Sequence, residues 1–315
     1  MVGGSWSLAC NACGKCCNSP PALSLREWFA HRAVFIASLA IERVARRRVG
    51  ERLVAGGADR VERVLEAQDI DAQDALADTL FHGAGLRDQG WISVTLQGYD
   101  YPSAGRCPAL ALDGLCTLHD AGKPARCTAV PLDPLVPDRW QTVALGARRE
   151  GVRALGADCI RDGLDKDATP LIDDARVIDT AALERDRAAL VFERRLWRDA
   201  VAAALAAAPG ALAALKQGGR LTIAPVPALL AVARVSPACH AAAIDVTRQQ
   251  RALIDACVSA ALARRRLDER ALTQELRGFA QAHARAFDEL SRSPTSAAQH
   301  DPAFAREVEN WLGLS

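Results

Sequence analysis

Several features that would point directly to a partner are missing from this chain of 315 residues. The formal net charge is +1, so no global field favours nucleic acid or acidic substrates as partners. No apolar run reaches the length of a membrane span, and the N-terminus lacks the basic and apolar regions of a signal peptide. We therefore expect a cytoplasmic protein that has no membrane span and binds no nucleic acid.

Familiar catalytic motifs are missing as well. We find no Ser–His–Asp arrangement, no Walker loop and no G-x-G-x-x-G sequence. Paired acids such as Asp173-Asp174 fit a solvated turn better than an acid–base site. The sequence therefore leaves open whether the protein is an enzyme, and it gives no indication of the oligomeric state.

The chain is instead rich in cysteine near its N-terminus, where Cys10, Cys13, Cys16 and Cys17 fall within eight residues. The C-x2-C-x2-C spacing lets thiolates in a tight turn converge on one zinc or iron–sulfur centre. Gly14 favours such a turn, since it accepts positive φ and allows backbone N–H groups to face the sulfurs. A disulfide knot or idle thiols are the alternatives, and a reducing cytoplasm favours the metal centre.

A second group of cysteines follows much later in the chain. Asp113-Gly114, between two apolar runs, predicts a hairpin that would bring the segments with Cys107 and Cys116 near each other. The N-terminal loop is too short to fold alone, so we expect a metal to tie it to this hairpin. Metal binding would then contribute on the order of 10 kcal/mol to folding.

Eight cysteines are thus candidate metal ligands. They can form two four-thiolate sites that divide the adjacent pair, whose side chains project in different directions, or one site with spare thiols. His119 could replace one ligand. Zinc and iron–sulfur clusters both accept four thiolates, so the residue types alone do not select the metal. The candidate ligands are Cys10, Cys13, Cys16, Cys17, Cys107, Cys116, Cys127 and Cys159.

The other two cysteines, Cys239 and Cys257, lie on helical patterns beside Ala and Ile, which predicts core positions. They belong to a region rich in Ala, Leu and Arg that begins near residue 170. Asp301-Pro302 is a good N-cap and first residue for the last helix of this region. The predicted helices cover about 180–208, 226–235, 239–265, 268–291 and 302–312.

The sequence predicts a mostly α fold with an α+β N-terminal part. Ser24 and Glu27 form a capping box, and we expect the helix that they open to extend to about Gly56-Gly57. A second helical pattern covers about 59–81, and residues 91–96 look like a strand. These elements give a cysteine-cluster metal-binding domain over 1–165, with a β-hairpin and a helical insert at about 24–90. A helical C-terminal region over 166–315 follows it.

The cysteine motifs resemble those of the bacterial YkgJ-like cysteine-cluster family, described as zinc- or iron-chelating, which includes proteins similar to flagellin lysine N-methylases. The resemblance covers roughly residues 10–160, apart from the insert. This chain departs from the family pattern with Leu118-His119 for Ile-Tyr, Lys123 and Thr128 for Arg, and Val130 for Phe. The matching segments are Cys10-x2-Cys13-x2-Cys16-Cys17, Cys107-Pro108-x-Leu110, Cys116-Thr117-Leu118-His119, Lys123-Pro124-x-x-Cys127 and Pro131.

The resemblance implies a metal-binding domain and, together with the C-x2-C-x2-C run, favours an iron–sulfur centre over zinc. Three functions from different classes remain open. The first is a metal-binding protein with a mainly structural centre, acting in metal handling or maturation. The second is an S-adenosylmethionine-dependent protein lysine N-methyltransferase, with a protein as substrate. The third is a helical interaction protein whose metal only anchors its N-terminus.

Overall fold

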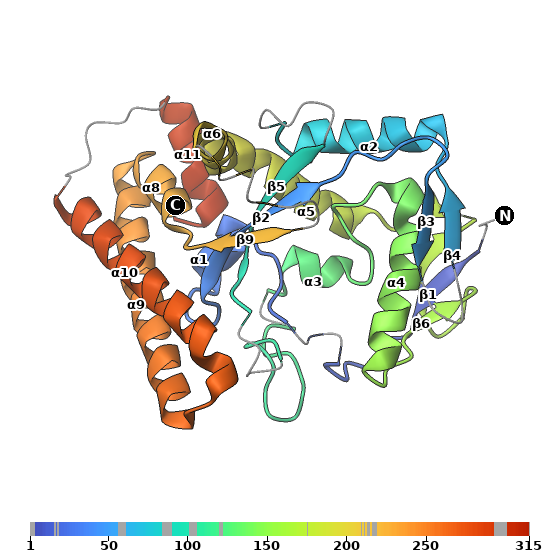
Figure 1. Cartoon of the computed structure of the whole chain (residues 1–315), viewed down its shortest axis with the longest axis horizontal. Coiled ribbons are helices and arrows are strands. Elements are labelled where there is room, and N and C mark those ends of the chain that lie inside the picture. Colours follow the sequence, from blue (N-terminus) through green and yellow to red (C-terminus); the bar gives the residue numbers. More distant parts are fainter. Residues whose placement is uncertain are drawn as a thin grey trace. The chain divides into compact units, whose positions relative to one another are not determined.

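The structure, a computed structural model, is mostly helical with some β structure, as the sequence predicts (Figure 1). No helix in its described part is long and apolar enough to cross a membrane. The described residues are 4–15, 17, 19–55, 61–83, 90–100, 106–119, 122–174, 176–208, 210, 212, 215, 219–292 and 301–314.

The chain divides into two compact units, and each unit is built from three separate segments. This division differs from the consecutive regions 1–165 and 166–315 that we expected from the sequence. Unit 1 comprises Met1–Pro21, Val44–Ser93 and Ala109–Val191, and unit 2 comprises Ala22–Arg43, Val94–Pro108 and Phe192–Ser315.

Unit 1 contains an antiparallel four-stranded sheet with the strand order β6-β1-β7-β8. The short N-terminal strand β1 therefore lies between two strands from much later in the chain. Its Trp6 belongs to a buried cluster with Leu145, Ile160 and Ile172. The strands are β1 (Trp6–Leu8), β6 (Ile160–Asp162), β7 (Thr169–Asp173) and β8 (Arg176–Val177).

Unit 1 also contains a separate two-stranded hairpin, β3 (Arg52–Ala55) paired with β4 (Val61–Val64). Figure 1 shows this hairpin beside α4, and residues of both strands contact that helix. A second buried cluster joins Leu80 to Leu190. The helices are α2 (Ala67–Leu80), α3 (Ala125–Ala129), η2 (Asp138–Trp140), α4 (Gln141–Ala154) and α5 (Ala181–Glu193), the last of which continues into unit 2.

Unit 2 combines a three-stranded sheet of order β5-β2-β9 with most of the helices. Its two longest helices, α9 and α10, lie side by side and bury Ile254, Val258, Leu276 and Phe279 in one cluster (Figure 1). The elements are α1 (Leu25–Ala30), β2 (Ala37–Val44), β5 (Trp91–Gly98), η3 (Arg194–Arg198), α6 (Asp199–Ala207), β9 (Arg220–Ile223), α8 (Val226–Ala233), α9 (Pro237–Arg264), η4 (Leu267–Glu269), α10 (Arg270–Arg292) and α11 (Pro302–Leu312).

A buried carboxyl group holds the start of α1 in unit 2. Glu193 accepts hydrogen bonds from the backbone N–H of Leu25 (2.6 Å) and from the indole N–H of Trp197 (3.0 Å). Burial raises the pKa of Glu193 from 4.5 to about 7, although both bonds favour the charged form. η3, a π-helical turn, follows directly after this residue.

Several local predictions are confirmed. Ser24 and Glu27 form the capping box, and Asp301 caps the last helix by accepting from the N–H of Ala303. The five C-terminal helical segments agree closely with α5 to α6, α8, α9, α10 and α11, although the strands β7, β8 and β9 also lie beyond residue 168.

The predicted helical insert at 24–90 is wrong between α1 and α2, although α2 confirms most of the second helical pattern at about 59–81. α1 ends at Ala30, and β2, β3 and β4 all follow before α2 begins at Ala67. β2 is the middle strand of its sheet and its first five residues are buried. A strand buried on both faces reads as a continuous apolar run, which by periodicity alone resembles a buried helix.

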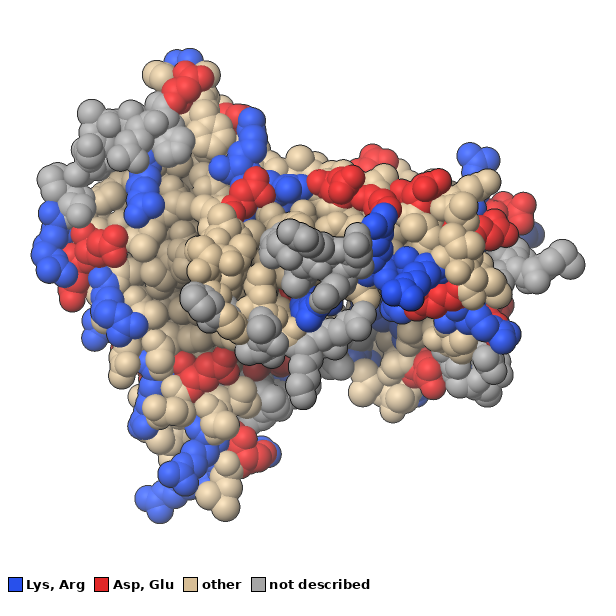
Figure 2. All heavy atoms as spheres, turned by 45° about the horizontal axis from the view of Figure 1, so that its top comes forward, with Lys and Arg blue, Asp and Glu red and all other residues tan. Residues whose placement is uncertain are grey.

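The surface carries charges of both signs. Figure 2 shows Lys and Arg side chains interspersed with Asp and Glu over the face drawn there. Many charged side chains of the described residues form ion pairs on the same element or on neighbouring elements, as Arg46 does with Asp74 and Arg195 does with Glu307.

Candidate metal centre

The N-terminal cysteine loop, residues 10–17, begins where β1 ends. β1 pairs with β6 in a register that places Leu8 opposite Ile160, and the N–H of Ala9 donates to the carbonyl oxygen of Cys159 at 2.8 Å. Cys10 is the next residue. Backbone pairing therefore brings the first and the last of the eight candidate cysteines to adjacent positions on neighbouring segments.

A contact between two glycines joins the loop to the 110–116 hairpin. Gly14 has φ +69°, and a Cβ atom on it would lie 2.5 Å from the carbonyl oxygen of Gly114. Gly114 also has positive φ, +85°, and a Cβ atom there would lie 3.8 Å from the carbonyl oxygen of Cys13. The close approach therefore requires glycine at position 14, whereas a Cβ atom on Gly114 would make only an ordinary contact with Cys13.

Within the loop, short-range hydrogen bonds form a compact turn. The N–H of Cys17 donates to the carbonyl oxygen of Gly14 at 3.0 Å, and the N–H of Cys13 donates to Asn11 Oδ1 at 3.3 Å. Lys15 Nζ donates to the carbonyl oxygen of Gly156 at 2.6 Å. Ala9 and Lys15 thus contact the segment just before β6, at Cys159 and Gly156, and Gly14 contacts the hairpin.

The hairpin is short, and Cys116 lies at its base. Leu110 and Cys116 form a single antiparallel bridge, and Asp113 Oδ1 accepts from the N–H of Leu115 in the turn. The Asp113-Gly114 turn is therefore confirmed, although the flanking segments form no extended strands. His119, the alternative ligand, is exposed, and its N–H donates to the carbonyl oxygen of Cys116 at 3.2 Å.

Helix α3 carries Cys127, which is half-buried. Ala129 of the same helix belongs to the cluster around Trp6, and Cys159 packs against that cluster. Arg126 pairs with Asp186 at 2.8 Å and with Asp133 at 3.3 Å, so ion pairs hold this short helix on both sides. Cys127 therefore lies on an element that shares its core with β1 and β6.

Six of the eight candidate ligands lie in unit 1. Cys10 and Cys13 are exposed, and the other four are half-buried. Cys107 is buried and belongs to a segment of unit 2, two residues before unit 1 resumes at Ala109. Cys16 lies outside the described residues. The six in unit 1 are Cys10, Cys13, Cys17, Cys116, Cys127 and Cys159.

The described residues include no three His, Cys, Asp or Glu side chains already positioned to hold a metal ion. Backbone contacts bring together the segments that carry Cys10, Cys13, Cys116 and Cys159, and each of these segments supplies a thiol. Thiols are the donor type that zinc and iron–sulfur centres take, so the residues present fit such a centre.

Of the two remaining cysteines, Cys239 is a core residue, as predicted, whereas Cys257 is half-buried at the edge of a core cluster. Cys239 is buried near the start of α9, where its N–H donates to Ser236 Oγ, and Cys257 packs against the cluster between α9 and α10. Burial raises the pKa of both thiols, which disfavours the thiolate that a metal requires.

Sequence patterns gave no indication of two residues that matter here. Lys15 holds the loop against Gly156, and Arg126 holds the helix of Cys127 through Asp186, and both of these partners lie far away in sequence. No protein-family model, curated protein or solved structure matches this chain. The interpretation of the site therefore depends on the cysteine motifs and on these contacts.

Proposed function

We propose that this chain is a metal-binding protein in which the N-terminal cysteine loop and the hairpin group hold an iron–sulfur or zinc centre. The contact between Gly14 and Gly114 supports this proposal most directly, because it joins the segments of the two cysteine groups. The pairing of Ala9 with Cys159 supports it a second time.

The resident metal would convert these weak loop contacts into a stable small cysteine-rich unit. Short loops bury little apolar surface, and four metal–thiolate bonds compensate for the cost of ordering them. Cys10, Cys13, Cys116 and Cys159 lie on directly contacting segments, so they are the first candidates for one site. Cys17 and Cys127, which also lie in unit 1, would then belong to a second site or remain as spare thiols.

We favour iron–sulfur over zinc because of the C-x2-C-x2-C run and the resemblance to flagellin lysine N-methylases. Protein purified without oxygen should be brown, should contain iron and acid-labile sulfide in similar amounts, and should bleach in air. A colourless anaerobic preparation with stoichiometric zinc and no sulfide would establish a zinc centre instead.

Cysteine variants test whether the two groups share the metal. Cys13→Ser and Cys116→Ser should each lower the metal content and the melting temperature. A Cys239→Ala/Cys257→Ala double variant is the matched control, since it removes two thiols outside both groups and should keep the metal. If either single variant keeps full metal content, or if the control loses it, the assignment of ligands is wrong.

A second candidate is an S-adenosylmethionine-dependent protein lysine N-methyltransferase. The exposure of Cys10 and Cys13 favours it over a helical interaction protein whose metal is purely structural. A structural four-thiolate site is usually closed, whereas a catalytic centre keeps an accessible side. Binding of S-adenosylmethionine to the metal-loaded protein, measured by calorimetry, would support the methyltransferase. Metal-loaded protein that does not bind it would leave a metal-binding or interaction protein.

A further inference from the structure

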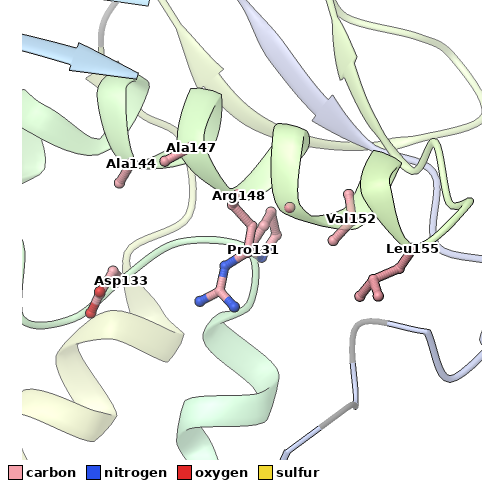
Figure 3. A pocket seen from close by; sticks show the side chains of 8 residues that line it. Pro131, Asp133, Ala144, Ala147, Arg148, Val152 and Leu155 are labelled. Atoms are coloured by element: carbon pink, nitrogen blue, oxygen red, sulfur yellow. The ribbon is translucent and has the colours of Figure 1, made fainter. Parts of the chain in front are cut away.

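A pocket of about 430 Å³ lies in unit 1, between α4 and the segment that follows α3 (Figure 3). Most of its lining is apolar and comes from Pro131 and from Ala144, Ala147, Val152 and Leu155 of α4 and its end. Gly151 also lines the pocket, together with two charged side chains, Asp133 and Arg148. A volume of this size suits a small ligand, since pockets for small molecules span about 300–1,000 Å³.

The charge of Asp133 is compensated within the protein. Its Oδ1 accepts from the N–H of Leu135 at 3.0 Å and pairs with Arg126 at 3.3 Å. Arg126 also pairs with Asp186, so this acidic side chain belongs to an ion-pair group beneath the pocket. A ligand cation would therefore have to compete with a guanidinium group that is already in place.

Arg148 differs from the neighbouring arginines of its own helix. Arg149 pairs with Asp162 at 2.7 Å, and Arg153 pairs with Asp158 at 3.0 Å. Arg148 is half-buried and has no acidic partner within ion-pair distance in the part of the chain that the structure describes. Figure 3 shows its side chain projecting from α4 beside Pro131. The pocket therefore contains one cation that the surrounding described residues do not neutralise.

The pocket adjoins segments that carry candidate metal ligands. Leu155, at one end of the lining, precedes Gly156, whose carbonyl oxygen accepts from Lys15 of the cysteine loop. Val152 belongs to the buried cluster against which Cys159 packs. A ligand in the pocket would thus contact the same helix end that fastens the loop.

We propose that this pocket binds a small organic anion that consists of a carboxylate on an apolar body. The Arg148 guanidinium would form paired hydrogen bonds with the carboxylate, a geometry for which its planar donors are suited. The apolar face of α4 and Pro131 would cover the rest of the ligand. This binding site is independent of which metal the cysteines hold, although its position beside the centre depends on the proposed function.

Calorimetric titration with hexanoate and with the neutral hexanamide tests the proposal. Hexanoate should bind the wild-type protein saturably, and hexanamide should bind at least 10-fold more weakly. Arg148→Met, which keeps the apolar stem but removes the charge, should weaken hexanoate binding at least 10-fold. Arg148→Lys should restore part of the affinity, since it keeps the charge without the paired donors.

Arg153→Met is the matched control, since it removes a cation from the same helix outside the pocket, and it should bind hexanoate like the wild type. The metal content and melting temperature of each variant separate this proposal from the preceding one. Absence of hexanoate binding to wild-type protein, or equal affinity in a folded Arg148→Met variant, overturns the anion site while leaving the metal centre unaffected. If the cysteine variants lose metal but bind hexanoate normally, the metal centre and the anion site are both supported as separate sites.

Discussion

Replacing Gly14 by Ala tests the contact on which the proposed centre depends. The new methyl group would lie 2.5 Å from the carbonyl oxygen of Gly114, closer than a Cβ atom approaches backbone oxygen in real structures. The methyl carbon is fixed in place by the backbone of residue 14 and the oxygen belongs to backbone, so neither can swing aside as the end of a flexible side chain would. The cysteine loop would have to move away from the hairpin.

The free-energy cost of Gly14→Ala has two contributions. Positive φ at Gly14 costs an L-residue about 1–2 kcal/mol, and forcing an extra methyl group into a filled space costs about 1–3 kcal/mol. A substitution at Gly163 distinguishes the cost of positive φ from the cost of the steric clash. Gly163 also has positive φ (+83°), but a Cβ atom there would meet nothing within 4 Å. Gly163→Ala should therefore show the first cost only, and Gly14→Ala should show both.

The assay is the metal content after anaerobic gel filtration, followed by competition with a chelator and by thermal unfolding. If the contact and the metal are coupled, an extra cost of about 2 kcal/mol lowers the metal affinity of Gly14→Ala roughly 30-fold relative to Gly163→Ala. The reasoning fails if the two variants bind metal equally and melt at the same temperature.

Two further predictions concern buried charges. Because the pKa of Glu193 is raised from 4.5 to about 7, its contribution to stability is complete below pH 4.5 and is lost as the pH rises through 7, by up to about 3 kcal/mol. Burial lowers the pKa of His283 to about 4, so this residue makes the protein more stable as the pH rises, which is opposite to the effect of Glu193. Urea unfolding must therefore compare Glu193→Gln with the wild type at each pH. A wild-type minus variant difference in unfolding free energy that does not change between pH 5 and 8 contradicts the prediction. Arg126→Met should cost about 3–5 kcal/mol by leaving the buried carboxylate of Asp186 without this guanidinium, and adding Asp186→Asn should recover part of that loss.

Local signals in the sequence predicted helix starts well. Ser24 with Glu27 and Asp301 with Pro302 act through hydrogen bonds to residues two or three positions away, so the information lies within one short window. The Asp113-Gly114 turn was predictable for the same reason. Helices after residue 180 follow from regular patterns of Ala and Leu over long stretches.

Strand β2 was not predictable in this way. Whether the apolar run from Ala37 forms a helix or a strand depends on β5 and β9, which lie far away in sequence and pair on either side of it. The candidate site shows the same limit. Cysteine spacing predicts a metal centre, but the contact of Gly14 with Gly114 and the position of Arg148 beside Pro131 in the pocket arise only in the folded chain.

The interleaving of the two units has a consequence for synthesis on the ribosome. β1 is made first, yet β6 and β7, its partners on both sides, are made only after residue 159, so the cysteine loop must wait for them. Unit 1 is complete at Val191, whereas unit 2 needs the rest of the chain. The segments of unit 1 that carry the proposed metal centre are thus all made before the C-terminal helices are translated. A truncation at residue 191 would, however, leave Ala22–Arg43 and Val94–Pro108 without the segment that completes their unit.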